Sequence, residues 1–190
     1  MKSGTDYPTN QAVAVLLCGH TGGGKTTHLL NWPRPWVLDL ESNMKGAVEY
    51  HRSVKPDLWF AWDTPTTDKS GQPLEERKQF DRCKELIQGA IDDPQVTTIC
   101  IDGFGRLCDL LKEKLVWETG IEKPLIIGGR KQMSVSLWGP FGQAVKALVW
   151  DIKGKKPLIV TCHLKVDENE LTTVKEEKVD MQGELGKANS

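Results

Sequence analysis

Short runs of apolar residues recur along the chain, and each is closed by a glycine or a polar side chain. Runs of this length with such boundaries are typical of strands that are buried in a sheet. They predict five strands, over residues 12–18, 36–40, 58–62, 97–102 and 157–162. Because the first run is apolar without interruption, we expect its strand to be buried on both faces.

Between these runs the apolar residues follow helical spacing instead. Phe80, Cys83, Leu86 and Ala90 lie three or four residues apart, which predicts an amphipathic helix over residues 74–90. Similar patterns predict helices over residues 25–32, 104–115 and 141–152. Strands and helices that alternate in this way favour an α/β fold, in which a mostly parallel sheet carries helices on both faces.

Two stretches follow neither pattern. Residues 120–137 show no clear period and contain Gly128, Gly129, Arg130 and Lys131, so we expect a long loop there. Beyond residue 163 the chain turns polar, and we expect residues 164–190 to form a hairpin or a flap. No repeat or low-complexity tract divides the sequence. A single domain over residues 1–190, with its core at about 10–163, is therefore expected.

Composition narrows the class of protein. The 190 residues are 38% hydrophobic and 27% charged, as in ordinary globular proteins. The formal net charge is −1, so no global basic field indicates a nucleic-acid partner. No apolar run approaches the roughly 18–20 residues that span a bilayer, and the first residues lack the apolar stretch of a signal peptide. We therefore expect no membrane partner.

The five cysteines stand singly, without a C-x-x-C pair. Cys18, Cys100 and Cys162 lie inside apolar runs, where a free thiol behaves as a small hydrophobic side chain. This use of cysteine favours a reduced, cytoplasmic setting and does not favour a zinc site.

The most specific motif is GHTGGGKT at residues 19–26, a full match to G-x-x-x-x-G-K-[ST]. It stands between a predicted strand and a predicted helix, which is the position that a phosphate-binding loop requires. The alternative is a glycine-rich turn that matches the motif by chance, and such a turn need not stand there. Backbone N–H groups of such a loop and of the following helix point at phosphate. Lys25 would reach the β- and γ-phosphates, and the Thr26 hydroxyl would ligate Mg²⁺. The residues expected to bind the nucleotide are Gly19, His20, Thr21, Gly22, Gly23, Gly24, Lys25, Thr26 and Thr27.

Two predicted strands lead into carboxylates. Asp102 closes one of them, where a second support for Mg²⁺ is expected, often through a water. The alternative is that Asp102 only caps the next helix. Glu41 follows the run at 36–40, and hydrolysis needs a base or orienting group for water at this edge of the sheet. Period-two alternation places Asp39 and Glu41 on the same side of the strand, with Glu41 nearer the edge. We expect Glu41 to act, with Asp39 as the second candidate and helix capping as the alternative.

His163 ends the last predicted strand at the same edge of the sheet. A polar side chain there could touch the γ-phosphate and report its loss to the polar segment that follows. The alternative is a surface histidine at a strand end. His163 therefore joins Lys25 and Glu41 as a candidate catalytic residue.

Taken together, these residues resemble the RecA-type ATPases, most closely the small RecA-core proteins of bacteriophages that assist single-strand annealing and recombination. The resemblance implies a RecA-like core that binds ATP and Mg²⁺, hydrolyses ATP with stimulation by DNA, and assembles into a ring or filament. It covers roughly residues 10–187 and uses residues 19–26, 37–41, 98–102, 138–152, 158–163 and 182–187.

The resemblance also implies partners. Residues 120–137 and the segment after His163 correspond to the two loops that face single-stranded DNA in RecA-type filaments, so Arg130, Lys131 and Lys165 are the expected contacts. A phage single-strand-binding protein would be a further partner, and the host cytoplasm the location. Two features depart from the pattern of the family. Its members usually have at least one more strand after the last one predicted here, and the two candidate DNA loops of this chain are only modestly basic.

Two other functions are compatible with the loop. A P-loop ATPase switch, such as a helicase loader, would use nucleotide to control a protein interface. A P-loop nucleoside kinase would need a mobile arginine-rich lid, and only Arg130 lies in a suitable loop. No residue pattern specifies the base, so the expectation of ATP over GTP depends on the resemblance.

Overall fold

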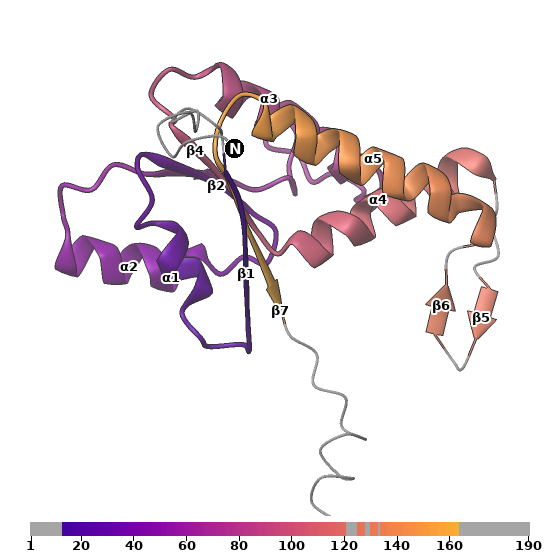
Figure 1. The fold of residues 1–190 in the computed structure, drawn as a ribbon, viewed down its shortest axis with the longest axis horizontal. Helices are drawn as coiled ribbons and strands as arrows, with labels where there is room; N and C mark the ends of the chain where they lie inside the picture. Colours follow the sequence, from indigo (N-terminus) through magenta and orange to yellow (C-terminus); the bar gives the residue numbers. More distant parts are fainter. Residues whose placement is uncertain (1–12, 121–124, 128–129, 133, 164–190) are drawn as a thin grey trace, which may run out of the picture.

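The centre of the protein is a five-stranded parallel sheet with the strand order β1-β7-β4-β2-β3 (Figure 1). The computed structural model describes residues 13–120, 125–127, 130–132 and 134–163. The expected strands are all present, four of them within two residues of the expected bounds, whereas β3 begins three residues later than its apolar run. The strands of this sheet are β1 (Ala14–Gly19), β2 (Pro35–Asp39), β3 (Ala61–Asp63), β4 (Thr98–Asp102) and β7 (Leu158–His163).

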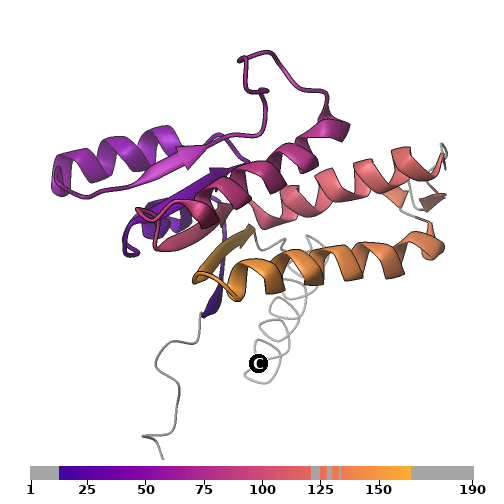
Figure 2. The same ribbon diagram turned by 90° about the horizontal axis from the view of Figure 1, so that it is seen from above.

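Helices cover both faces of this sheet, as the turned view shows (Figure 2). One face carries α1 (Lys25–Leu29) and α2 (Met44–Val54), and the other carries α3 (Glu76–Asp92), α4 (Phe104–Thr119) and α5 (Val135–Lys153). The expected α/β class, a parallel sheet with helices on both faces, is therefore confirmed. No helix in the described part of the chain combines the length and the apolar character that a membrane crossing requires.

Successive side chains of the central strands pack alternately into two separate hydrophobic clusters, one on each face of the sheet. On β4, Ile99 and Ile101 pack into the cluster under α3, α4 and α5, whereas Cys100 packs into the cluster under α1 and α2. All three side chains are fully buried. This is the period-two geometry of a strand that is covered on both faces, and it fixes the carboxyl ends of the strands at one edge.

The expectation that β1 is buried on both faces is wrong. Val15 and Leu17 lie half-buried against the α1–α2 cluster, but Leu16 is 57% exposed and Cys18 is also exposed. Within the described residues β1 pairs with β7 alone, so it forms an edge of the sheet. The apolar run revealed a strand but not its place in the sheet, because strand order is set by partners distant in sequence.

Helix α5 begins at Val135 rather than at residue 141. Pro140 lies inside it, and two nearby glycines interrupt the apolar pattern, which made its first turns hard to recognise. Leu137, only 5% exposed, anchors this part of the helix by burial. The burial of Leu137 therefore outweighs the low helix propensity of the proline and the two glycines.

The stretch 120–137 is not simply a loop. It holds a two-stranded antiparallel sheet of β5 (Leu125–Ile127) and β6 (Arg130–Gln132), and Arg130 and Lys131 are neighbours on β6. Figure 1 shows this pair of strands beyond the ends of α4 and α5, apart from the five-stranded sheet. Lys165 and the expected hairpin or flap at 164–190 lie outside the described residues.

Candidate functional site

The carboxyl ends of β1, β7, β4 and β2 bring the candidate residues to one edge of the sheet. Gly19 is in register with His163, and Asp39 is in register with Asp102. Open parallel sheets bind their ligands at this edge. A cavity of about 280 Å³ lies there, lined by residues 21–27 together with Glu41, Asn43, Ala47 and His163.

The loop between β1 and α1 has the shape that phosphate binding requires. Gly22 and Gly24 have φ angles of 80° and 73°, which side chains with a Cβ rarely adopt. The ammonium group of Lys25 donates to the backbone carbonyls of Gly19 (3.0 Å) and His20 (2.9 Å), so it lies across the loop. This places a cation where the motif expects the phosphates of a nucleotide.

Asp102 lies at the centre of a buried hydrogen-bond network and is only 1% exposed. The hydroxyl of Thr26 donates to its Oδ2 (2.7 Å), and the hydroxyl of Thr161 donates to its Oδ1 (2.6 Å). Burial raises the pKa of Asp102 above its ordinary value, the two hydroxyl hydrogen bonds oppose this rise, and the nearby carboxylates of Glu41 and Asp39 add to it.

The pair of Thr26 and Asp102 fits a magnesium ion. Hydroxyl and carboxylate oxygens are hard ligands of the kind that Mg²⁺ takes, and a cation beside Asp102 would offset the repulsion between the carboxylates. No group of three or more His, Cys, Asp or Glu side chains in the described part of the chain could hold a metal ion. A metal that binds with phosphate oxygens and several waters does not need such a group.

Glu41 and His163 meet directly, although they come from the ends of different strands. Nε2 of His163 lies 2.7 Å from Oε2 of Glu41, and Nδ1 lies 3.4 Å from the Lys25 ammonium and 3.5 Å from the Thr21 hydroxyl. An ammonium only donates and an ionised carboxylate only accepts. The imidazole therefore accepts at Nδ1 and donates from Nε2, which links Lys25 to Glu41 through His163.

Asp39, the second candidate for the base, has a different environment. Its carboxylate accepts backbone N–H groups from Glu41 (3.2 Å), Asn43 (3.3 Å) and Met44 (3.3 Å), and the residue is 4% exposed. Asp39 therefore holds the turn that leads into α2. Strand β2 ends at Asp39, so Glu41 lies beyond it, and the alternation that we expected to extend to Glu41 does not apply.

Gly103, directly after β4, makes room for Glu41. Its φ angle is 91°, and a Cβ added there would lie 2.7 Å from Cγ of Glu41. Its N–H donates to the Thr161 hydroxyl (2.9 Å). No local pattern singles out Gly103 or Thr161, because each acquires its role from residues that are distant in sequence.

Comparison with known proteins adds little to this geometry. No protein-family model matches the chain, and no curated protein matches it. Among solved structures, the chain is similar to the assembled ATPase EscN, in complex with its central stalk EscO, from the type III secretion system of enteropathogenic E. coli. The identity is 12%, the match covers 86% of this chain and 40% of that chain, and the TM-score is 0.46.

A second similar structure is a prototypical ATPase from the type III secretion system of pathogenic bacteria. The identity is 14%, the match covers 87% of this chain and 49% of that chain, and the TM-score is 0.45. The chain thus spans less than half the length of either protein. With TM-scores this low, neither similarity bears on function, which depends on the site itself.

A second cavity, of about 410 Å³, continues from the phosphate loop along the groove between α1 and α2. It shares Gly24 and Thr27 with the first cavity and reaches Tyr50 and His51 on α2. His51 is 2% exposed, and its Nε2 lies 3.1 Å from the backbone carbonyl of Thr27. Its buried Nδ1 has no hydrogen-bond partner among the described residues. The sequence carried no signal for His51, since only the packing of α1 against α2 gives it this position.

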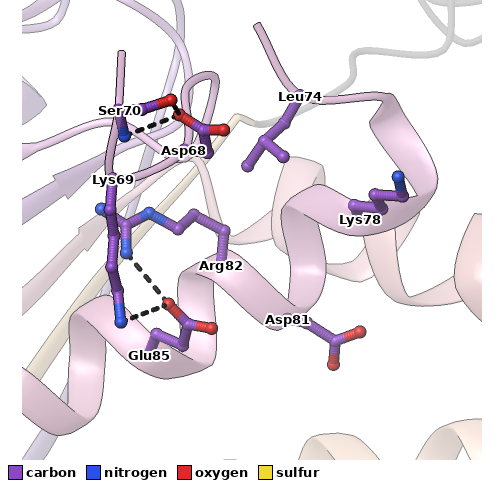
Figure 3. A pocket seen from close by; sticks show the side chains of 8 residues that line it. All are labelled: Asp68, Lys69, Ser70, Leu74, Lys78, Asp81, Arg82 and Glu85. Atoms are coloured by element: carbon purple, nitrogen blue, oxygen red, sulfur yellow. Dashed lines mark hydrogen bonds and ion pairs between the residues drawn. The ribbon is translucent and has the colours of Figure 1, made fainter. Parts of the chain in front are cut away.

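A third cavity, of about 540 Å³, lies away from the phosphate loop, between residues 68–74 and α3 (Figure 3). Its charged groups are already paired, some of them with residues outside the cavity. Glu85 binds Arg82 at 3.0 Å and Lys69 at 3.7 Å, and Asp68 accepts the backbone N–H of Ser70 at 2.8 Å. This is the pattern of a polar surface hollow, and none of the candidate site residues lines it.

Proposed function

We propose that the chain binds ATP with Mg²⁺ at the loop 19–27 and hydrolyses it. The observation that carries this proposal is the continuous set of contacts from the loop to two strand ends. Lys25 contacts His163, His163 holds Glu41, and Thr26 is bonded to Asp102. A loop that bound a nucleotide without hydrolysing it would not need a partly exposed carboxylate, such as that of Glu41, beside it.

Each residue has a role that follows from its position. Lys25 and the loop N–H groups bind the β- and γ-phosphates, and Thr26 with Asp102 would hold Mg²⁺, which when bound neutralises phosphate charge. Glu41 accepts the proton of the attacking water as a general base. His163, between Lys25 and Glu41, senses the γ-phosphate and positions the Glu41 carboxylate.

The groove between α1 and α2 is suited to the nucleoside. A carbonyl only accepts, so Nε2 of His51 donates to Thr27, which ties α2 to the phosphate loop. Tyr50, 55% exposed at the same groove, offers an aromatic face for stacking.

Calorimetry with MgATP and with magnesium tripolyphosphate separates the nucleoside groove from the phosphate loop, because tripolyphosphate lacks the nucleoside. We expect wild type to bind ATP more tightly than tripolyphosphate. Tyr50→Ala removes the exposed aromatic face of the groove, so it should lower the affinity for ATP by about tenfold, the effect of one lost stacking contact. Its affinity for tripolyphosphate should not change.

The outcomes of this experiment are distinct. If wild type binds ATP and tripolyphosphate equally well, the nucleoside does not use the groove. If it binds neither, and phosphate release from ATP is also absent, the proposed function itself fails. Lys25→Ala, which should lose both ligands, is the control for the phosphate end.

We also propose what the hydrolysis is used for. Copies of the chain associate into a ring or filament that acts on single-stranded DNA, as the RecA-type resemblance implies. Arg130 and Lys131 follow each other on β6, in a hairpin apart from the main sheet. With a net charge of −1, one copy can neutralise few DNA phosphates, whereas an assembly would repeat this pair along the strand. A phage single-strand-binding protein remains part of the proposal.

Oligo-dT should raise the rate of phosphate release, and filter binding of oligo-dT should need ATP and weaken steeply with salt. The double change Arg130→Glu/Lys131→Glu should abolish both effects of DNA and leave the basal rate unchanged. Lys153→Glu/Lys155→Glu, an equal charge reversal at the end of α5, is the matched control and should behave as wild type. If wild type retains no oligo-dT with ATP at low salt, the protein-switch alternative replaces the DNA proposal.

A further inference from the structure

Two cysteines face each other directly behind the phosphate site. Cys18 on β1 is in register with Cys162 on β7, and the two strands are parallel. Residues in register on parallel strands project from the same face of the sheet, here the face that carries α4 and α5. Neighbouring strands lie about 4.8 Å apart, inside the range of about 4.4–6.8 Å between the Cα atoms of disulfides.

The surroundings of the two thiols differ in a way that suits stepwise reaction. Cys18 is exposed, whereas Cys162 is half-buried. Burial raises the pKa of Cys162 and the adjacent Cys18 thiol raises it further, while a hydrogen bond from the Gly105 backbone acts in the opposite direction.

The other three cysteines are less suited to this chemistry. Cys83 and Cys100 are fully buried, and burial raises the pKa of Cys83 to about 12. Cys108 is half-buried on α4, and burial raises its pKa as well. A thiol that is buried and seldom ionised reacts slowly, so Cys18 is the first point of attack.

We propose that Cys18 and Cys162 form a modification site for low-molecular-weight disulfides such as oxidised glutathione. The Cys18 thiolate attacks one sulfur of the reagent, forms a mixed disulfide and releases one glutathione thiolate, which takes up the Cys18 proton. Cys162 then loses its proton and attacks the Cys18 sulfur, and the second glutathione leaves as a thiol. Two cysteines are oxidised and one oxidised glutathione is reduced to two thiols.

Closure of this bond would act on the phosphate site. The Cβ atoms of a disulfide lie about 3.8 Å apart, whereas the Cβ atoms of residues paired in a sheet lie about 4.5–5.5 Å apart, so closure would move these two Cβ atoms toward each other by about 1 Å. The next residues are Gly19, whose carbonyl holds Lys25, and His163, which holds Glu41. A shift of this size at a reacting centre lowers turnover strongly.

The full-length protein, incubated with oxidised glutathione, tests the proposal in two ways. Peptide mapping by mass spectrometry should find Cys18 joined to Cys162, and the number of free thiols in the denatured chain should fall from five to three. Cys18→Ser and Cys162→Ser should each prevent the cross-link, whereas Cys108→Ser, the matched control, should form it as wild type does. ATP turnover, which depends on the proposed function, should fall by at least about tenfold and recover with dithiothreitol.

A mixed disulfide that persists at Cys18, a bond from Cys18 to Cys108, or a bond between two chains would each overturn the proposal. A mapped Cys18–Cys162 bond with unchanged turnover would overturn the coupling to the phosphate site. If the reduced protein hydrolyses no ATP, the proposed function fails, and the mapping still decides whether the two thiols react.

Discussion

Lys25→Ala should lower the affinity for MgATP by at least about a hundredfold and leave the fold intact. The Lys25 ammonium now donates to two loop carbonyls and contacts His163. Its transfer to phosphate would create charge-assisted hydrogen bonds, whose loss costs about 3 kcal/mol in total. Calorimetry gives the affinity, and circular dichroism with thermal unfolding shows whether the fold remains.

The comparison variant is Lys45→Ala, which removes a lysine from the first turn of α2, where the residue is exposed. It should bind MgATP as wild type does, because Lys45 does not line the phosphate cavity. An equal loss in both variants would mean that general positive charge, and not the position of Lys25, attracts the nucleotide. Unchanged affinity in Lys25→Ala would exclude this loop as the binding site.

Glu41→Gln should separate binding from hydrolysis. Glutamine keeps the size of the side chain and can still accept from Nε2 of His163, but it cannot accept the proton of water. Steady-state phosphate release should fall by about 10²-fold or more, while the affinity for MgATP should remain close to wild type. Measurement of both quantities on the same preparation decides the point.

Asp39→Asn is the matched carboxylate control. Asp39 holds three backbone N–H groups at the start of α2, so its replacement should lower the melting temperature and have a smaller effect on turnover. If Asp39→Asn stops hydrolysis in a folded protein and Glu41→Gln does not, the roles assigned to the two residues are reversed.

The sequence predicted the elements of the fold better than their arrangement. The apolar runs predicted β2 and β4 as strands, and all residues of both strands are buried, as a strand covered on both faces requires. The run of β1 has the same pattern, although Leu16 and Cys18 are exposed at a sheet edge. The two strands at 125–127 and 130–132 were missed, since strands of three residues are too short to show a period.

The same limit applies to the candidate site. Lys25 and Thr26 are adjacent in a motif, and Asp102 closes a strand, so local sequence was enough to propose them. The contact between Glu41 and His163 depends on β4 lying between β2 and β7, which no local pattern specifies. Thr161 and His51 were missed for a related reason: their importance comes from the atoms that face them, Asp102 and the Thr27 carbonyl.

The hydrogen bond between Glu41 and His163 has a consequence for how fast the chain would consume ATP when idle. While Nε2 of the imidazole is bound to Oε2 of Glu41, a water molecule has to compete with it for the oxygen that would take its proton. Bound ATP would then persist until the imidazole turns away, so the lifetime of the ATP-bound state would be set by a side-chain rotation. Any partner that displaces His163 would shorten that lifetime without touching the nucleotide.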